Sequence, residues 1–261
     1  MGVLQTDKWL DDQFFEPTAI LKKIDENLNK EQAFYKYLKQ FGMYQPNRRT
    51  KETFEQLKEA NAWKKIDRYY KKYKKFWNGP AVKIAIFPID TGNRRLMRQT
   101  RGRAGITFHE IMYLFLSPQD DEKEWESLFI HEYHHAVRLN HFKKEMTEYT
   151  LLDSLLLEGL AEHAVLECCG EKYLGPWCDA IEEPQLDSYW EKWFSSKLDV
   201  KKKEAIHDDL LFGKRNLPNL LGYSMGFYIV KVYKKKHDIS TVSMIDLPPK
   251  KLLLKKFFTK E

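Results

Sequence analysis

The hydrophobic positions of the first 78 residues recur at helical spacing. In residues 17–28 the apolar side chains fall on one face of a helix that Pro17 would begin, and they are Ile20, Leu21, Ile24 and Leu28. Residues 63–77 repeat this spacing with lysines on the opposite face, and the apolar positions are Ile66, Tyr69, Tyr70, Tyr73, Phe76 and Trp77. We therefore expect helices here, and we interpret the basic face as solvated surface rather than a nucleic-acid or membrane stripe.

The pattern changes after the NGP break at residues 78–80. VKIAIFPI (82–89) predicts a strand, and Pro88 favours a sheet edge or a strand end. AGITFHEIMYLFLS (104–117) predicts one bent strand or a tight pair of strands. Ser117, Pro118 and the acidic residues that follow predict the start of a helix that runs through Asn140.

A second helix is predicted over residues 150–169, with Thr150 as its N-cap and Gly170 as its stop. The chain is predicted to be mostly helical from there on, and residues 248–261 are expected to form a docked terminal helix. The fold class that follows is α+β. It is mostly helical, with a small antiparallel or mixed sheet packed on the helix 118–140 and on the downstream helix 150–169.

Composition narrows the class of protein only modestly. The chain is 43% hydrophobic and 31% charged, as ordinary globular proteins are, and its net charge of +6 is spread along the sequence. Five arginines between residues 94 and 103 leave nucleic-acid binding as a rival, but we expect no nucleic-acid partner. The longest apolar run, IMYLFL, is too short to span a bilayer, no secretory signal is visible, and the three cysteines form no disulfide framework. We expect a cytoplasmic protein without a membrane span, and its oligomeric state stays open.

The segment HEYHH at residues 131–135 carries the candidate chemistry. His131 and His135 are four residues apart, so both imidazoles lie on one face of the predicted helix and can bind one zinc ion. Glu132 would then lie beside the metal as a general base. His134 points about 60° away around the helix and is left out of the site.

A catalytic zinc needs a third protein ligand, and two candidates remain open. His141 has the spacing of the metzincin pattern, but Arg138 occupies the position where that pattern needs glycine for a sharp turn. Glu158 and Glu162 interrupt the apolar helix 150–169 and share a face, where a metal or a charged partner would compensate their burial. Glu158 as ligand and Glu162 as hydrogen-bond partner of a zinc histidine would account for both, unless they lie on an exposed face.

Taken together, H-E-x-x-H and the E-G-x-A-E of residues 158–162 resemble the gluzincins. More narrowly, the chain resembles a family of predicted zinc-dependent proteases of bacilli, a domain of unknown function, over about residues 80–235. The softer elements of this resemblance are Gly105-Ile106-Thr107 and LGYSMGFYIV at 221–230. It implies a zinc-peptidase-like catalytic domain over 80–261 that follows an N-terminal helical region over 1–79.

The resemblance also implies roles for the residues. Zn²⁺ would be held by His131, His135 and Glu158, and Glu162 would orient His131. The strand around Gly105, Ile106 and Thr107 would be an edge that holds an extended peptide or protein substrate. Glu132 would act as the general base of a zinc metallopeptidase.

Tyr223 lies between two glycines and is our candidate donor to the oxyanion, with a packed helical tyrosine as the competing interpretation. Tyr228 and His207 are weaker candidates for the same role. The alternative function is a non-catalytic zinc protein that binds peptides or acts like a chaperone, although zinc binding alone does not require Glu132.

Overall fold

The computed structural model describes residues 1–254 and divides the chain into two compact units, Met1–Ala136 and Val137–Glu261. The fold is α+β, mostly helical with one small sheet in the first unit. A division between residues 79 and 80, as the sequence suggested, stays a prediction. In residues 1–254 no helix is long and apolar enough to cross a membrane.

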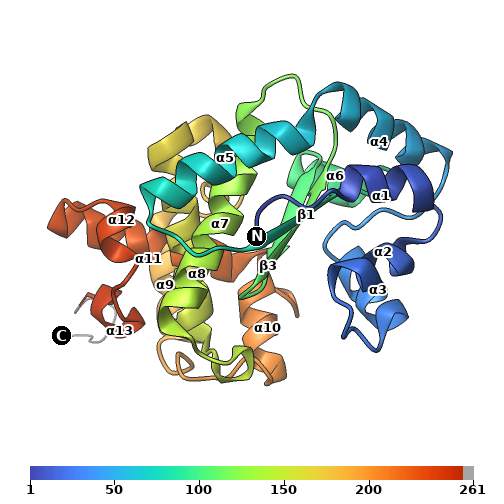
Figure 1. Cartoon of the computed structure of the whole chain (residues 1–261). Coiled ribbons are helices and arrows are strands. Elements are labelled where there is room, and N and C mark those ends of the chain that lie inside the picture. Colours follow the sequence, from blue (N-terminus) through green and yellow to red (C-terminus); the bar gives the residue numbers. More distant parts are fainter. Residues whose placement is uncertain (255–261) are drawn as a thin grey trace. The chain divides into compact units, whose positions relative to one another are not determined.

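The first unit contains six helices, a three-stranded sheet and the first part of α7 (Figure 1). The elements are α1 (Thr6–Gln13), α2 (Pro17–Ile24), α3 (Glu31–Lys39), α4 (Arg48–Glu59), α5 (Ala62–Phe76), β1 (Lys83–Pro88), α6 (Arg94–Thr100), β2 (Arg103–Thr107), β3 (Ile111–Leu116) and α7 (Lys123–Phe142). The strand order is β1-β3-β2, with β1 parallel and β2 antiparallel to β3. The predicted edge position of β1 is confirmed, and residues 104–117 form the tight strand pair.

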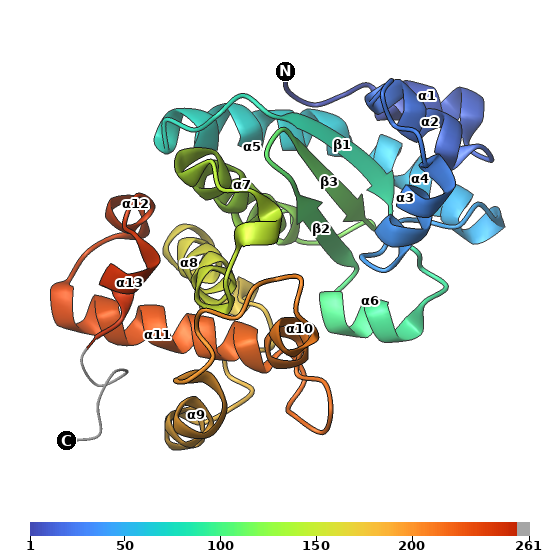
Figure 2. The ribbon, with the colours of Figure 1, turned by 90° about the horizontal axis from the view of Figure 1, so that it is seen from below.

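The sheet is covered on both faces (Figure 2). Helix α7 packs on the face that carries Gly105 and Thr107, and α5 packs against α7 through Tyr70 and Tyr133. The opposite face carries Tyr113, which contacts the ring of Phe34 in α3, and Phe87, which contacts the ring of Tyr44. Strands β1 and β3 are almost fully buried and β2 is half-buried, so the covered sheet supports α7.

Two details of the first unit differ from the sequence prediction. Helix α7 begins at Lys123 rather than at Pro118, because Ser117 closes the end of the strand pair by donating its hydroxyl to Gly102 O. Phe76, predicted to lie on the buried face of α5, is 57% exposed, whereas Trp77 beside it is buried. The last buried residue of α5 is therefore Tyr73, and Trp77, the first residue after the helix, extends the same apolar contact.

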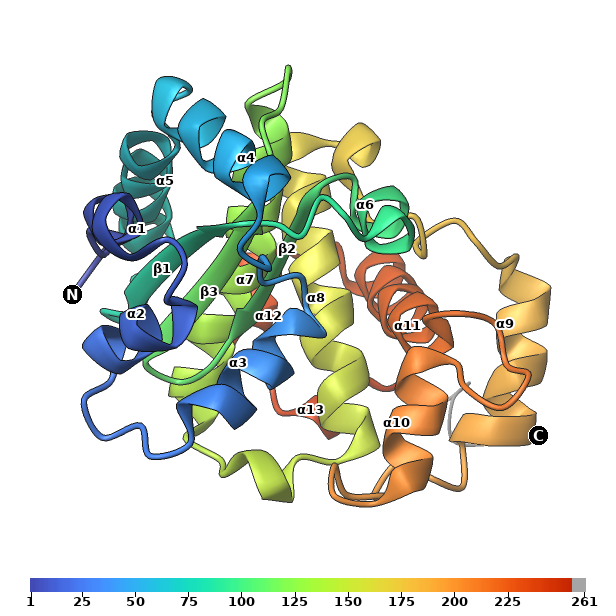
Figure 3. The same ribbon diagram turned by 90° about the vertical axis from the view of Figure 1, so that its right-hand side faces the viewer.

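The second unit consists of helices around one apolar cluster (Figure 3). Its helices are α8 (Leu151–Cys169), α9 (Glu183–Tyr189), α10 (Ala205–Phe212), α11 (Leu221–His237), α12 (Thr241–Met244) and α13 (Pro249–Leu252), with short turns at Met146–Glu148, Glu171–Tyr173 and Trp190–Phe194. The predicted capping of α8 is confirmed, because Thr150 and Asp153 form a capping box and Gly170 ends the helix. Of the predicted terminal helix over 248–261, only α13 is formed within the described part, and residues 255–261 lie outside it.

Candidate metal centre

Helix α7 places the two histidines on one face by its own periodicity. Its other side is apolar: Trp125, Phe129 and Tyr133 are at most 1% exposed, and Phe129 packs against Tyr133. The four-residue spacing then leaves the rings of His131 and His135 adjacent, with centroids 4.5 Å apart. The local sequence alone accounts for this pair.

Glu132 lies on α7 between His131 and His135 in the sequence, and it is only 5% exposed. Its Oε2 accepts a hydrogen bond of 2.7 Å from the hydroxyl of Thr107 on β2. The same hydroxyl lies 3.1 Å from the backbone oxygen of Glu132. A carboxylate that is buried and hydrogen-bonded in this way has a restricted set of positions.

In the second unit, α8 carries Glu158 and Glu162, and α8 crosses α11 in close contact. The crossing is possible because two glycines meet there: a Cβ on Gly159 would lie 2.1 Å from Gly226 O, and a Cβ on Gly226 would lie 1.9 Å from Leu155 O. Such distances exclude any side chain. Gly159 therefore permits the close packing of α8 on α11.

Glu162 is buried, at 4% exposure, so the interpretation of an exposed acidic face is wrong for this residue. Its Oε2 accepts a hydrogen bond of 2.9 Å from Gly175 N–H and lies 3.6 Å from Cys178 Sγ. The loop after α8 therefore returns to this carboxylate and compensates part of its burial. The expected role of Glu162 in orienting His131 stays a prediction.

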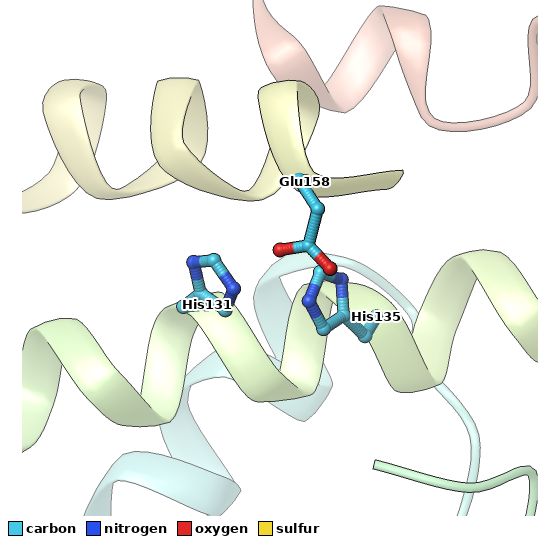
Figure 4. A group of neighbouring side chains, drawn as sticks. All are labelled: His131, His135 and Glu158. Carbon is cyan, nitrogen blue, oxygen red and sulfur yellow. The ribbon is translucent and has the colours of Figure 1, made fainter. Parts of the chain in front are cut away.

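Ligand atoms of His131, His135 and Glu158 all lie within 4.8 Å of one another. Figure 4 shows the carboxylate of Glu158 directed at the two imidazoles. Zinc bonds of about 2.0–2.2 Å in a tetrahedral site place donor atoms roughly 3.4 Å apart, so modest side-chain adjustment suffices. Two imidazole nitrogens and one carboxylate are also a donor set that catalytic zinc sites use, and the three residues fit the ion.

The other two histidines near the motif have different surroundings. His134 is fully buried, and its ring packs edge-on against Trp77. His141 lies in the last turn of α7, with Nδ1 3.2 Å from Asp246 Oδ1. The metzincin turn does not form, because α7 continues through Arg138, whose guanidinium donates to the carbonyls of Ile245 and Leu247.

The candidates for an oxyanion donor lie on or beside α11. Tyr223 contacts the rings of Trp177 and Phe212, at 5.3 and 6.2 Å between centroids. Gly222 and Gly226 do permit a close approach, but it is made by the backbones of α10 and α8, so these glycines give no support to a donor role for Tyr223. Its role as donor therefore stays a prediction that rests on resemblance alone.

The two weaker candidates already have partners. The hydroxyl of Tyr228 donates to Asp187, and burial raises the pKa of this tyrosine well above its usual value. His207 is fully buried between Ser154 and Asp208, each 2.9 Å from one of its ring nitrogens. Neither side chain has a hydrogen to offer a substrate without breaking these contacts.

Two contacts of the acidic residues were missed in the sequence. The bond from Gly175 to Glu162 comes from a loop whose conformation no local pattern predicts. The bond from Thr107 to Glu132 did leave a signal, because Gly105 and Thr107 are two apart and therefore share one face of their strand. The strand therefore has a second contact besides the substrate edge that its sequence predicts.

Comparison with known proteins gives a family. Residues 62–254 match the model of a family described as "Predicted Zn-dependent protease". "Uncharacterized protein YjaZ" of Bacillus subtilis is 36% identical over 217 residues, which cover 83% of each chain. "Uncharacterized protein YjfC" of the same organism is 25% identical over 186 residues, 67% of this chain and 61% of the relative. No solved structure matches. The family match begins at the first residue of α5, earlier than the expected start near residue 80.

Proposed function

The chain belongs to the family of predicted zinc-dependent proteases, and from that premise we propose that it is a zinc metallopeptidase of the gluzincin type. The observation that carries the proposal is the group of His131, His135 and Glu158, whose ligand atoms lie within 4.8 Å of one another. Bound there, zinc would supply a Lewis acid that lowers the pKa of a coordinated water towards about 7.

The residues of the chain would divide the remaining work. Glu132 would take a proton from the attacking water and deliver it to the leaving amine. Its burial keeps this carboxylate out of bulk solvent, and its hydrogen bond to Thr107 limits its movement. Glu162 would orient His131, and Tyr223 would donate to the oxyanion of the substrate.

The edge strand β2 would bind the substrate. Within the described residues β2 pairs with β3 alone, so its other side can accept an extended peptide as an additional antiparallel strand. Backbone hydrogen bonds of this kind hold a peptide of almost any sequence. The substrate is therefore a peptide or protein segment in extended conformation.

Zinc content of the purified, metal-replete protein tests the ligand set. Glu158→Ala should lose the zinc of the wild type, whereas His141→Ala should keep it, since His141 is an exposed residue of the same helix α7 that carries His131 and His135. Loss of zinc in His141→Ala with retention in Glu158→Ala would refute the assignment.

Peptide-library cleavage by the zinc-loaded protein tests the reaction. Glu132→Gln should retain zinc and peptide binding but lose about 10²–10⁴-fold in kcat, because it removes the proton acceptor. A wild type that binds peptides and zinc without cleaving them would instead support the non-catalytic alternative. Tyr223→Phe should lower kcat with zinc content and KM unchanged if this tyrosine is the oxyanion donor.

A further inference from the structure

Strand β2 and helix α7 meet at the carboxylate of Glu132. The hydroxyl of Thr107 lies 2.7 Å from Glu132 Oε2, and both side chains are nearly inaccessible, at 8% and 5% exposure. Thr107 and Glu132 are 25 residues apart in the sequence, so this contact is a product of the fold. The Thr107 side chain thus points at the proposed base and away from solvent.

Gly105 provides the room for the same carboxylate. A Cβ on Gly105 would lie 2.7 Å from both Cγ and Cδ of Glu132, and 2.8 Å from Oε1. The backbone of Gly105 has no left-handed φ, so glycine is needed here for space and not for conformation. Any other residue would push the side chain of Glu132 off the strand.

We propose that Gly105 and Thr107 are positioning residues for the general base, and that β2 therefore both binds the substrate and places Glu132. This inference rests on the proposed function. The Thr107 hydroxyl fixes Oε2 by donating to it, which leaves Oε1 as the oxygen that receives the proton from water. The backbone at Gly105 closes the side on which the carboxylate would otherwise swing.

The arrangement links two parts of the reaction geometry. The peptide pairs with the backbone of β2, and the base is held by two side-chain positions of the same five-residue strand. The distance between the scissile carbonyl and the base is then set within one element. A fixed distance matters because a displacement of about 1 Å can reduce a rate about 100-fold.

Thr107→Val and Thr107→Ser form the matched pair that tests the inference. Valine keeps the shape of threonine and removes the hydroxyl, so kcat should fall about 10–100-fold with KM within about twofold and zinc content unchanged. Serine restores the hydroxyl and should recover kcat to within about threefold. Equal kcat in Thr107→Val and wild type, or no recovery in Thr107→Ser, would overturn the proposal.

Gly105→Ala tests the second contact. The added methyl group should displace the carboxylate and lower kcat at least about tenfold while zinc remains bound. In a Glu132→Gln background, neither Thr107→Val nor Gly105→Ala should lower the residual activity further, because the group they position is gone. Losses that multiply in the double variants would show that the two residues act independently of Glu132.

A third measurement does not depend on activity, and it separates this inference from the proposed function. In the metal-free protein, urea unfolding of Thr107→Val, Glu132→Ala and the double variant gives the coupling of the two side chains. We expect at least about tenfold coupling in the unfolding equilibrium constant, the value for a hydrogen bond to a charged group. Such coupling without any peptidase activity would leave the contact standing and refute the catalytic role, whereas absence of coupling would refute the contact itself.

Discussion

His163 of α8 should make the stability of the protein depend on pH. Its ring stacks on Phe227 of α11 with centroids 4.3 Å apart, and its Nε2 donates to the backbone oxygen of Phe227 at 3.0 Å. The other nitrogen, Nδ1, is buried and has no hydrogen-bond partner within residues 1–254. Protonation would place an N–H at Nδ1 where no acceptor exists, so burial lowers the pKa of His163 from 6.5 to about 4.

The magnitude follows from the difference between the two pKa values. The folded state binds the proton less tightly than the unfolded state, so the stabilising contribution is complete above pH 6.5 and is lost as the pH falls from 6.5 towards 4. The full difference corresponds to roughly 3 kcal/mol, of which about 2 kcal/mol is lost at pH 5.

Urea unfolding of the metal-free protein at pH 7.5 and pH 5 measures this loss. His163→Gln, which can keep a donor to Phe227 O but does not titrate, is the reference, and other titrating groups cancel in the comparison. The wild type should lose about 2 kcal/mol more than this variant between the two pH values. Parallel pH profiles for the two proteins would refute the reasoning, and so would an NMR titration that placed the native midpoint of His163 near 6.5.

Three further perturbations test the packing of the second unit and the charge of the first. Gly159→Ala should lower the free energy of unfolding by about 2–3 kcal/mol in urea titrations, since the new methyl group meets the backbone of Gly226 and not a flexible side chain; an unchanged midpoint would contradict the crossing. Arg138→Met should lower the free energy of unfolding by about 3 kcal/mol, because three carbonyls near the end of α12 lose a buried guanidinium donor. A thermal midpoint equal to that of the wild type would exclude this role. Replacing the exposed Arg94 and Arg98 of α6 by alanine should raise KM for acidic peptides at low salt and leave KM for neutral peptides unchanged. Salt at 0.5 M, where the Debye length is about 4 Å, should largely remove this difference. An equal rise in KM for both kinds of peptide would refute electrostatic attraction.

Features that depend on short stretches of chain were predictable from the sequence. The spacing of His131 and His135 fixes their common face, and the hydroxyl of Thr150 with the carboxylate of Asp153 fixes the start of α8. The absence of a metzincin turn before His141 was also predictable, because the left-handed backbone of that turn is costly for the arginine at position 138. In each case the cause and its effect lie within about ten residues.

Features that depend on a distant partner were not predictable. Ser117 has the chemistry of a helix N-cap, yet its hydroxyl bonds to Gly102 across the strand pair, and α7 begins six residues later. Gly222 and Gly226 flank Tyr223 in the sequence, and the close contacts that they allow are made by the backbones of α10 and α8. A glycine or a serine in the sequence indicates that a close contact forms at that position, but the partner in this contact is known only from the fold.

The polar row on α8 shows why both kinds of information are needed. Ser154, Glu158 and Glu162 follow one another at four-residue spacing on a largely apolar helix, and each needs a partner. Ser154 has His207: the Nδ1–H of that ring donates to Asp208, so Nε2 accepts from the serine hydroxyl. Glu162 accepts a hydrogen bond from the backbone N–H of Gly175 in the loop after α8.

Glu158 is the member of this row whose carboxylate oxygens group with two imidazoles of α7. The residues on either side of it in the row are tied to the second unit by the partners just described. Ser154 and Glu162 fix α8 to α10 and to the following loop one turn before and one turn after Glu158, so the backbone that carries the Glu158 carboxylate has little freedom to move. If that is correct, the affinity for zinc should fall in Ser154→Ala, which releases one of these neighbours without touching any ligand, and an unchanged affinity would show that Glu158 needs no such support.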